Sequence, residues 1–152
     1  MMNAECGMNP PAFGYPLEKG AEGTEQQTGE SIMELSKLSL ERLEGVDERL
    51  NAVVIECAAR CKFPFNVSEG LRTVEKQREY VRQGKSRTMN SKHLTGKAVD
   101  LYPLSMDRKL VDWSRFEDLA DLMFQVASGQ GVAIVWGGNW KTFVDKCHFE
   151  LK

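Results

Sequence analysis

Residues 91–100 read SKHLTGKAVD, and residues 145–150 near the C-terminus read DKCHFE. These two stretches contain both histidines of the 152-residue chain, His93 and His148. Two imidazoles and one carboxylate are a common ligand set for a catalytic zinc ion, which keeps a fourth position for water. If His93, Asp100 and His148 converge in the fold, they form such a site, and the chain is a zinc hydrolase.

Neither stretch is specific when it is taken alone. In the first stretch, His93 and Asp100 could simply be a surface histidine and an aspartate at the end of a strand. In the second, His148 is a single histidine, and single histidines are more often structural residues than metal ligands. Gly96 allows a turn between His93 and Asp100, so we expect His93 in a loop and Asp100 on the strand that follows. The combination of the two stretches carries the prediction of a metal site.

Length, charge and hydropathy limit the class of protein. A chain of 152 residues supports one domain with a real hydrophobic core. A formal net charge of −2 argues against a nucleic-acid partner, and we interpret the basic residues between 82 and 97 as a solvated loop, with attraction of an anionic polymer as the alternative. No apolar stretch reaches the roughly 20 residues of a membrane span, so no membrane insertion is expected. Residues 1–15 lack the pattern of a secretory signal.

The pattern of helices and strands predicts the fold class. Residues 1–30 are polar and rich in glycine and proline, so they are expected to form a flexible extension, and residues 31–152 a single catalytic domain. Helices are predicted from Ser31, with a capping box to Glu34, up to Gly45, and then at 46–63, 73–83 and, with a capping box at Ser114 and Glu117, 114–128. Strands are predicted at 65–71, 98–104, 132–136 and 148–151. This order lacks a βαβ rhythm and favours an α+β fold with a small, mostly antiparallel sheet flanked by helices.

Asp145 is the candidate general base that would accept a proton from an attacking water. On a regular strand Asp145 would face away from His148, so this role requires a turn or bulge between the two residues. Glu150 shares a strand face with His148 and is the alternative base or a partner of the ligand.

Other side chains are candidates for substrate contacts. Arg72, between an expected strand and helix, is suited to polarise a carbonyl or bind a carboxylate. Trp136 and Trp140 flank a glycine-rich turn and are predicted to line a groove, with packing in the core as the alternative for at least one of them. The chain contains no phosphate-binding loop, no Gly-x-Ser-x-Gly elbow and no His-Glu-x-x-His helix.

Together, the pattern SxHxxGxAxD at 91–100 and the pattern DxxHxE at 145–150 resemble zinc peptidases that cut peptidoglycan stem peptides. That group includes D-Ala-D-Ala carboxypeptidases and phage endolysins with L-alanyl-D-glutamate endopeptidase activity, and hedgehog signalling domains share its fold. Residues 69–73 (EGLRT), Gln77, residues 84–86 (GKS) and residues 136–140 (WGGNW) resemble the endolysin branch. The resemblance covers roughly residues 38–152.

Carried over by position, the resemblance implies a role for each matching residue. It implies Zn²⁺ held by His93, Asp100 and His148. It implies Asp145 as the catalytic acidic residue, at a place where the carboxypeptidases usually have glutamate. It further implies that Arg72 assists the carbonyl oxygen, and that Ser91 and Gln77 lie near the substrate.

The resemblance also implies a biological setting. The expected function is cleavage of the L-Ala–D-Glu bond of the peptidoglycan stem peptide by a monomer, made in the host cytoplasm and acting in the periplasm or cell wall after release. The alternatives are a D-Ala-D-Ala carboxypeptidase with the same metal chemistry, and a non-catalytic, zinc-containing cell-wall binding module in which Asp145 is dispensable.

Overall fold

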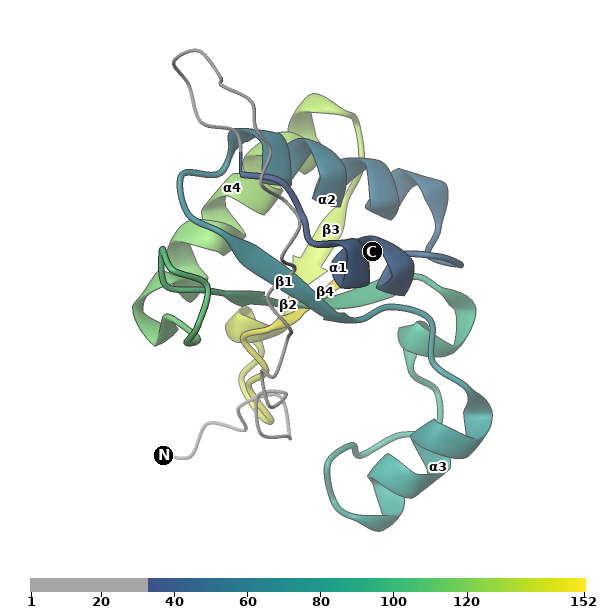
Figure 1. The fold of residues 1–152 in the computed structure, drawn as a ribbon. Helices are drawn as coiled ribbons and strands as arrows, with labels where there is room; N and C mark the ends of the chain where they lie inside the picture. The colour runs from purple at the N-terminus through teal and green to yellow at the C-terminus, as the bar shows by residue number, and fades with distance from the viewer. Residues whose placement is uncertain (1–32) are drawn as a thin grey trace.

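A four-stranded antiparallel sheet organises residues 33–152, which are the residues that this computed structural model describes (Figure 1). The strand order is β1-β2-β4-β3. The strands are β1 (Phe65–Glu69), β2 (Ala98–Pro103), β3 (Ile134–Trp136) and β4 (His148–Leu151). The expected extension at residues 1–30 lies outside the described residues. The prediction of an α+β fold with a small antiparallel sheet is confirmed.

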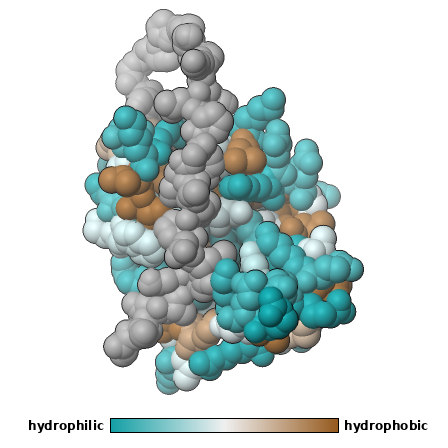
Figure 2. All heavy atoms as spheres, turned by 60° about the horizontal axis from the view of Figure 1, so that its bottom comes forward, coloured by the Kyte–Doolittle hydropathy of each residue, from teal (hydrophilic) through white to brown (hydrophobic). Residues whose placement is uncertain are grey.

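Helices flank the sheet. The α-helices are α1 (Lys37–Arg42), α2 (Glu48–Arg60), α3 (Val74–Arg82) and α4 (Phe116–Gly129). The 3₁₀ helices between residues 33 and 152 are η2 (Lys92–Thr95), η3 (Trp113–Arg115) and η4 (Gly137–Asn139). Helices α2 and α4 lie side by side over one face of the sheet, whereas α3 projects away from it (Figure 1). Figure 2 views the molecule from the side of α3 and shows mainly hydrophilic residues over this helix.

The hydrophobic core lies between the sheet and the pair α2 and α4. Leu50 and Val53 of α2, Met123 of α4 and Phe149 of β4 are all fully buried in it. Because side chains alternate along a strand, the strands that bury Val99 and Phe149 in the core direct Asp100 and His148 to the other face. Packing of the core therefore positions the candidate ligands.

Two helix starts differ from the prediction. Helix α1 begins at Lys37, because the hydroxyl of Ser36 accepts a hydrogen bond from the Ser39 N–H. Residues 33–36 are not helical, and Ser31 lies outside the described residues. Helix α4 has no capping box at Ser114, since the carboxylate of Asp112 caps η3 instead. The predicted cap at Thr73 is confirmed by its hydrogen bond from the Lys76 N–H.

Candidate active site and metal centre

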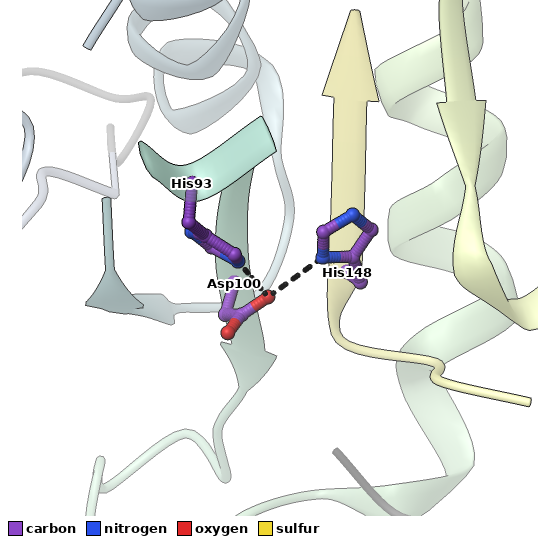
Figure 3. Close-up of side chains that lie close together, drawn as sticks. All are labelled: His93, Asp100 and His148. Atoms are coloured by element: carbon purple, nitrogen blue, oxygen red, sulfur yellow. Dashed lines mark hydrogen bonds and ion pairs between the residues drawn. The ribbon is translucent and has the colours of Figure 1, made fainter. Parts of the chain in front are cut away.

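His93, Asp100 and His148 converge in the structure. Each offers one nitrogen or oxygen atom, and these three atoms all lie within 4.8 Å of one another. Figure 3 shows both imidazoles directed at the Asp100 carboxylate, with His93 on η2, Asp100 on β2 and His148 on β4. All three side chains are buried. The structure thus brings together the three residues that the sequence analysis selected as metal ligands.

Local structure around η2 directs His93 towards the sheet. The Ser91 hydroxyl accepts a hydrogen bond from the His93 N–H at 3.2 Å and so begins the helix. Gly96 ends it with φ of 74°, a conformation that glycine adopts without a steric penalty. A Cβ at Gly96 would also collide with the carbonyl oxygen of Gly45. The expected turn between His93 and Asp100 is confirmed, and it requires glycine.

Hydrogen bonds on the outer sides of the imidazoles define which nitrogens face the centre. His93 Nδ1 lies 2.8 Å from the carbonyl oxygen of Gly70, which can only accept, so Nδ1 carries the proton. His148 Nε2 lies 2.8 Å from Glu150 Oε1, which places the proton on Nε2 in the same way. When both rings are neutral, His93 Nε2 and His148 Nδ1 carry lone pairs. These two nitrogens lie 3.2 and 3.3 Å, respectively, from Asp100 Oδ1. Three acceptors around one point fit a cation, and histidine nitrogen with carboxylate oxygen is a donor set that suits zinc.

The ionisation of the group reflects the same geometry. Burial alone would raise the pKa of the Asp100 carboxyl, but the adjacent imidazoles outweigh burial and hold this pKa well below its usual range. Burial alone would lower the pKa of His148, but its hydrogen bonds with Asp100 and Glu150 raise it to about 9. Protons thus compensate the buried carboxylate, and a bound metal ion would take over this role.

Asp145 reaches the same site through a turn. The His148 N–H donates to the Asp145 carbonyl oxygen at 3.1 Å, so residues 145–148 form the turn that the sequence analysis required. The Asp145 N–H donates to the carbonyl oxygen of Gly137 at 3.0 Å. A Cβ on Gly137 would collide with the Asp145 carbonyl oxygen, so only glycine allows this close approach. Burial and the charge of Asp100 raise the pKa of Asp145 to about 7.

Arg72 lies beside the metal-ligand group and is held by buried partners. Its Nη2 forms an ion pair with Glu69 Oε1 at 2.7 Å and lies 3.7 Å from Asp100 Oδ2. Its Nη1 donates to Gln77 Oε1 at 2.6 Å. Nε has no hydrogen-bond partner among residues 33–152, so one buried N–H of the guanidinium is unused.

Glu69 is a part of this network to which the sequence analysis assigned no role. Its carboxylate is buried and also pairs with Lys76 at 3.0 Å. The available signal was its position three residues before Arg72. That spacing is informative only when both side chains are known to be buried.

A cavity of about 300 Å³ opens over the metal-ligand group. Ser91, Trp140, Arg72 and Asp145 line it together with the three candidate ligands. The indole of Trp140 lies 5.1 Å from the His148 ring.

Gln77 and Trp136, which were also predicted to contact substrate, do not line this cavity. Gln77 is fully buried, and its amide donates to Ser86 Oγ at 2.9 Å and to the Thr88 carbonyl oxygen at 2.6 Å. Trp136 stacks on Phe149 and donates from Nε1 to the Lys146 carbonyl oxygen at 2.7 Å. Gln77 therefore holds the lining residues Ser86 and Thr88, whereas Trp136 packs in the hydrophobic core.

Glu150, the alternative base, is engaged by other groups. One carboxylate oxygen lies 2.8 Å from His148 Nε2, and the other lies 3.6 Å from Lys92 Nζ. Glu150 therefore orients the His148 imidazole, as carboxylates commonly do when they hydrogen-bond to a histidine that binds a metal ion.

The fold and the site define a class of protein, an α+β protein with a buried His-Asp-His candidate metal site in a cavity. The family model described as phage L-alanyl-D-glutamate peptidase matches residues 32–151, and the chain belongs to this family. None of the helices in residues 33–152 is long and apolar enough to cross a bilayer.

Two known proteins illustrate the similarity. The chain is 37% identical over 85 residues to the L-alanyl-D-glutamate peptidase of Listeria phage A118, an alignment that covers 56% of this chain and 29% of that protein. The match thus spans less than a third of the length of that relative. The crystal structure of the Serratia marcescens L-Ala D-Glu endopeptidase ChiX matches with a TM-score of 0.72 and 37% identity, over 79% of this chain and 91% of that one.

Proposed function

We propose that the chain is a zinc-dependent endopeptidase that hydrolyses the L-Ala–D-Glu bond of peptidoglycan stem peptides. The observation that carries the proposal is the convergence of three acceptor atoms from His93, Asp100 and His148 within 4.8 Å, next to the Asp145 carboxyl. Family membership and the likeness to the Serratia endopeptidase support the choice of bond.

In this proposal His93, Asp100 and His148 hold the metal ion. When bound, zinc would act as a Lewis acid towards the scissile carbonyl and lower the pKa of a water molecule. Asp145 accepts the proton of the attacking water and delivers it to the leaving nitrogen. Burial raises the pKa of Asp145 to about 7 in the metal-free protein, and a base whose pKa is raised towards neutral pH both accepts and returns a proton readily.

The remaining residues of the cavity bind and orient the peptide. Arg72 is assigned to the developing oxyanion, which its unused N–H and its place in the cavity wall support. Ser91 and Trp140 are assigned to substrate contacts because they line the cavity. Gln77 is assigned to positioning, since its buried amide bonds two lining residues, and Trp136 to packing of the core behind β4.

The biological setting is part of the proposal. A phage peptidase of this family would act as an endolysin on the wall or periplasmic murein after release from the host cytoplasm. Membership of a phage family supports this setting. We further propose that it acts as a monomer, because the cavity and all the residues assigned to it come from one chain.

Mass spectrometry of purified peptidoglycan, incubated with the zinc-loaded protein or with its Asp145→Ala variant, tests the proposal. New peptides with N-terminal D-glutamate, from the parent protein alone, are expected. Released D-alanine would instead identify a carboxypeptidase. Absence of any cleavage by a protein that still binds one zinc ion would favour the binding module and overturn the catalytic proposal.

A further inference from the structure

Charged side chains of both signs line the cavity. Asp100, Asp145 and Glu150 supply carboxylates, and residues 85–92 supply the cations Lys85, Arg87 and Lys92 to the lining. The ammonium of Lys92 is already bound to the Leu151 carbonyl oxygen at 2.6 Å and lies near Glu150.

Two cations of this wall stand against aromatic rings. Within residues 33–152, neither Lys85 nor Arg87 forms an ion pair. The Arg87 guanidinium lies 4.7 Å from the centre of the Phe143 ring, and Lys85 Nζ lies 5.8 Å from the centre of the Tyr80 ring. A cation over an aromatic face keeps its N–H donors at the ring edge available. Among residues 33–152, the cavity therefore offers two charged donors that form no ion pair with a carboxylate.

Contacts on two sides hold Arg87 in its place in the cavity lining. The residues flanking it, Ser86 and Thr88, are both bound by the buried Gln77 amide. Phe143, whose ring lies beneath the Arg87 guanidinium, is two residues before Asp145 in the chain and also lines the cavity. Phe143 has φ of 54°, a conformation that is unusual for a bulky residue and that is found where surrounding structure enforces a ligand-binding shape.

The chemistry of the proposed substrate provides the ligand for these donors. In the stem peptide the chain continues through the γ-carboxyl of D-glutamate, so its α-carboxylate is free. This α-carboxylate is bonded to the same carbon as the nitrogen that leaves. A bound substrate thus brings one more negative charge into a cavity that already contains three carboxylates, and a planar guanidinium matches a carboxylate with two parallel hydrogen bonds.

We propose that Arg87, assisted by Lys85, binds the free α-carboxylate of the D-glutamate residue and makes the enzyme prefer D-glutamate over its amidated form, D-isoglutamine. This inference rests on the proposed function, since it concerns the same cavity and the same bond. It assigns a specificity role to a part of the basic loop that charge and sequence alone left as a solvated segment.

The test uses two synthetic stem peptides that differ only in this group, one with D-glutamate and one with D-isoglutamine. For the zinc-loaded chain we expect kcat/KM to be roughly 10–100-fold higher on the D-glutamate peptide. Arg87→Gln is expected to reduce this ratio to near one, and Lys85→Gln to reduce it in part. Equal losses on both peptides in Arg87→Gln, or no preference in the parent chain, would overturn the inference.

Arg82→Gln is the matched control. It removes the same charge from the same region, but Arg82 is exposed, pairs with Glu79 and does not line the cavity. We expect it to keep the ratio of the parent chain. Loss of the preference in Arg82→Gln would mean that overall charge decides it and would count against a specific carboxylate site.

A binding measurement separates this inference from the proposed function. If the parent chain cleaves neither peptide, the proposed endopeptidase fails. Calorimetric dissociation constants for both peptides, measured on Asp145→Ala with and without Arg87→Gln, then decide the inference. Tighter binding of the D-glutamate peptide that depends on Arg87 would support it, and equal binding of the two peptides would refute it.

Discussion

Asp100 and His148 are register partners on the adjacent strands β2 and β4, and Asp100 Oδ1 lies 3.3 Å from His148 Nδ1. Directly opposite residues of an antiparallel pair share a face of the sheet. The backbone ladder therefore holds two of the three candidate ligands, and only His93 depends on the separate helix η2.

Asp100→Ala is expected to abolish stoichiometric zinc binding, because it removes the acceptor that both imidazoles face. We expect the zinc affinity to fall by more than about 100-fold. This loss is larger than the usual loss of affinity when a residue that only hydrogen-bonds to a metal ligand is replaced. Elemental analysis after dialysis measures the zinc content. Asp145→Ala is the control and should retain its zinc. One tightly bound zinc ion per chain in Asp100→Ala would contradict the assigned ligand set.

Asp145→Asn is expected to stabilise the chelated, metal-free protein above pH 7. Burial raises the pKa of Asp145 from 3.8 to about 7 in the folded state. The folded protein thus holds this proton more tightly than the unfolded chain does, and stability falls as the pH rises from about 4 to about 7.

The whole shift corresponds to at most roughly 4 kcal/mol. Solvent contact of the partly exposed carboxyl reduces this, so we expect the amide to add about 1–2 kcal/mol to the unfolding free energy at pH 8. Urea unfolding in the presence of a chelator provides the comparison. A variant less stable than the parent at pH 8, or equal gains at pH 4 and pH 8, would argue against a raised pKa.

The kcat/KM of the zinc-loaded protein is expected to rise with pH as Asp145 loses its proton, because only the ionised carboxylate accepts a proton. The pKa of Asp145 then sets the midpoint of this rising limb of the pH profile. In the metal-free protein its pKa is about 7. A divalent cation nearby favours the carboxylate, so the midpoint of the limb should lie below 7. The dependence of kcat/KM on pH shows the midpoint directly. A limb centred above pH 7 would conflict with Asp145 as the base.

Gly137→Ala is expected to lower kcat while zinc binding is retained. The added Cβ would collide with the Asp145 carbonyl oxygen and displace the base without touching the three ligands. A displacement of about 1 Å can reduce a rate by about 100-fold. Gly129→Ala is the control, since nothing lies within 4 Å of a Cβ at that position. Unchanged kcat in Gly137→Ala would show that the close approach does not position Asp145.

Gln77→Ala is expected to destabilise the fold by about 1–3 kcal/mol, because it leaves the buried Nη1 of Arg72 without its acceptor and removes the amide that holds residues 86 and 88. Gln83→Ala provides a comparison, as Gln83 is exposed and bonds only Glu79. Thermal unfolding of both variants measures the difference. Equal effects of the two substitutions would contradict a positioning role for Gln77.

Sequence patterns were sufficient where the relevant structure is local. The glycine turn at Gly96 and the need for a turn before His148 follow from residues close together in the chain, and the ligand set followed from combining two short patterns. Helix starts at Ser31 and Ser114 were predicted less well, because Ser36, five residues further on, caps α1, and Asp112, two residues earlier, caps η3.

The amino-acid sequence by itself determined the family, the α+β class and the identity of the residues that converge at the candidate metal centre. Only the tertiary structure decided which polar side chains reach the cavity. Gln77 supports its lining while Trp136 packs in the core, Arg72 is held by Glu69, and Arg87 stands over Phe143. Contacts of this kind, above all across the cavity from residues 85–92 to residues 140–145, depend on how separate segments pack. Residue spacing along the chain does not encode that packing.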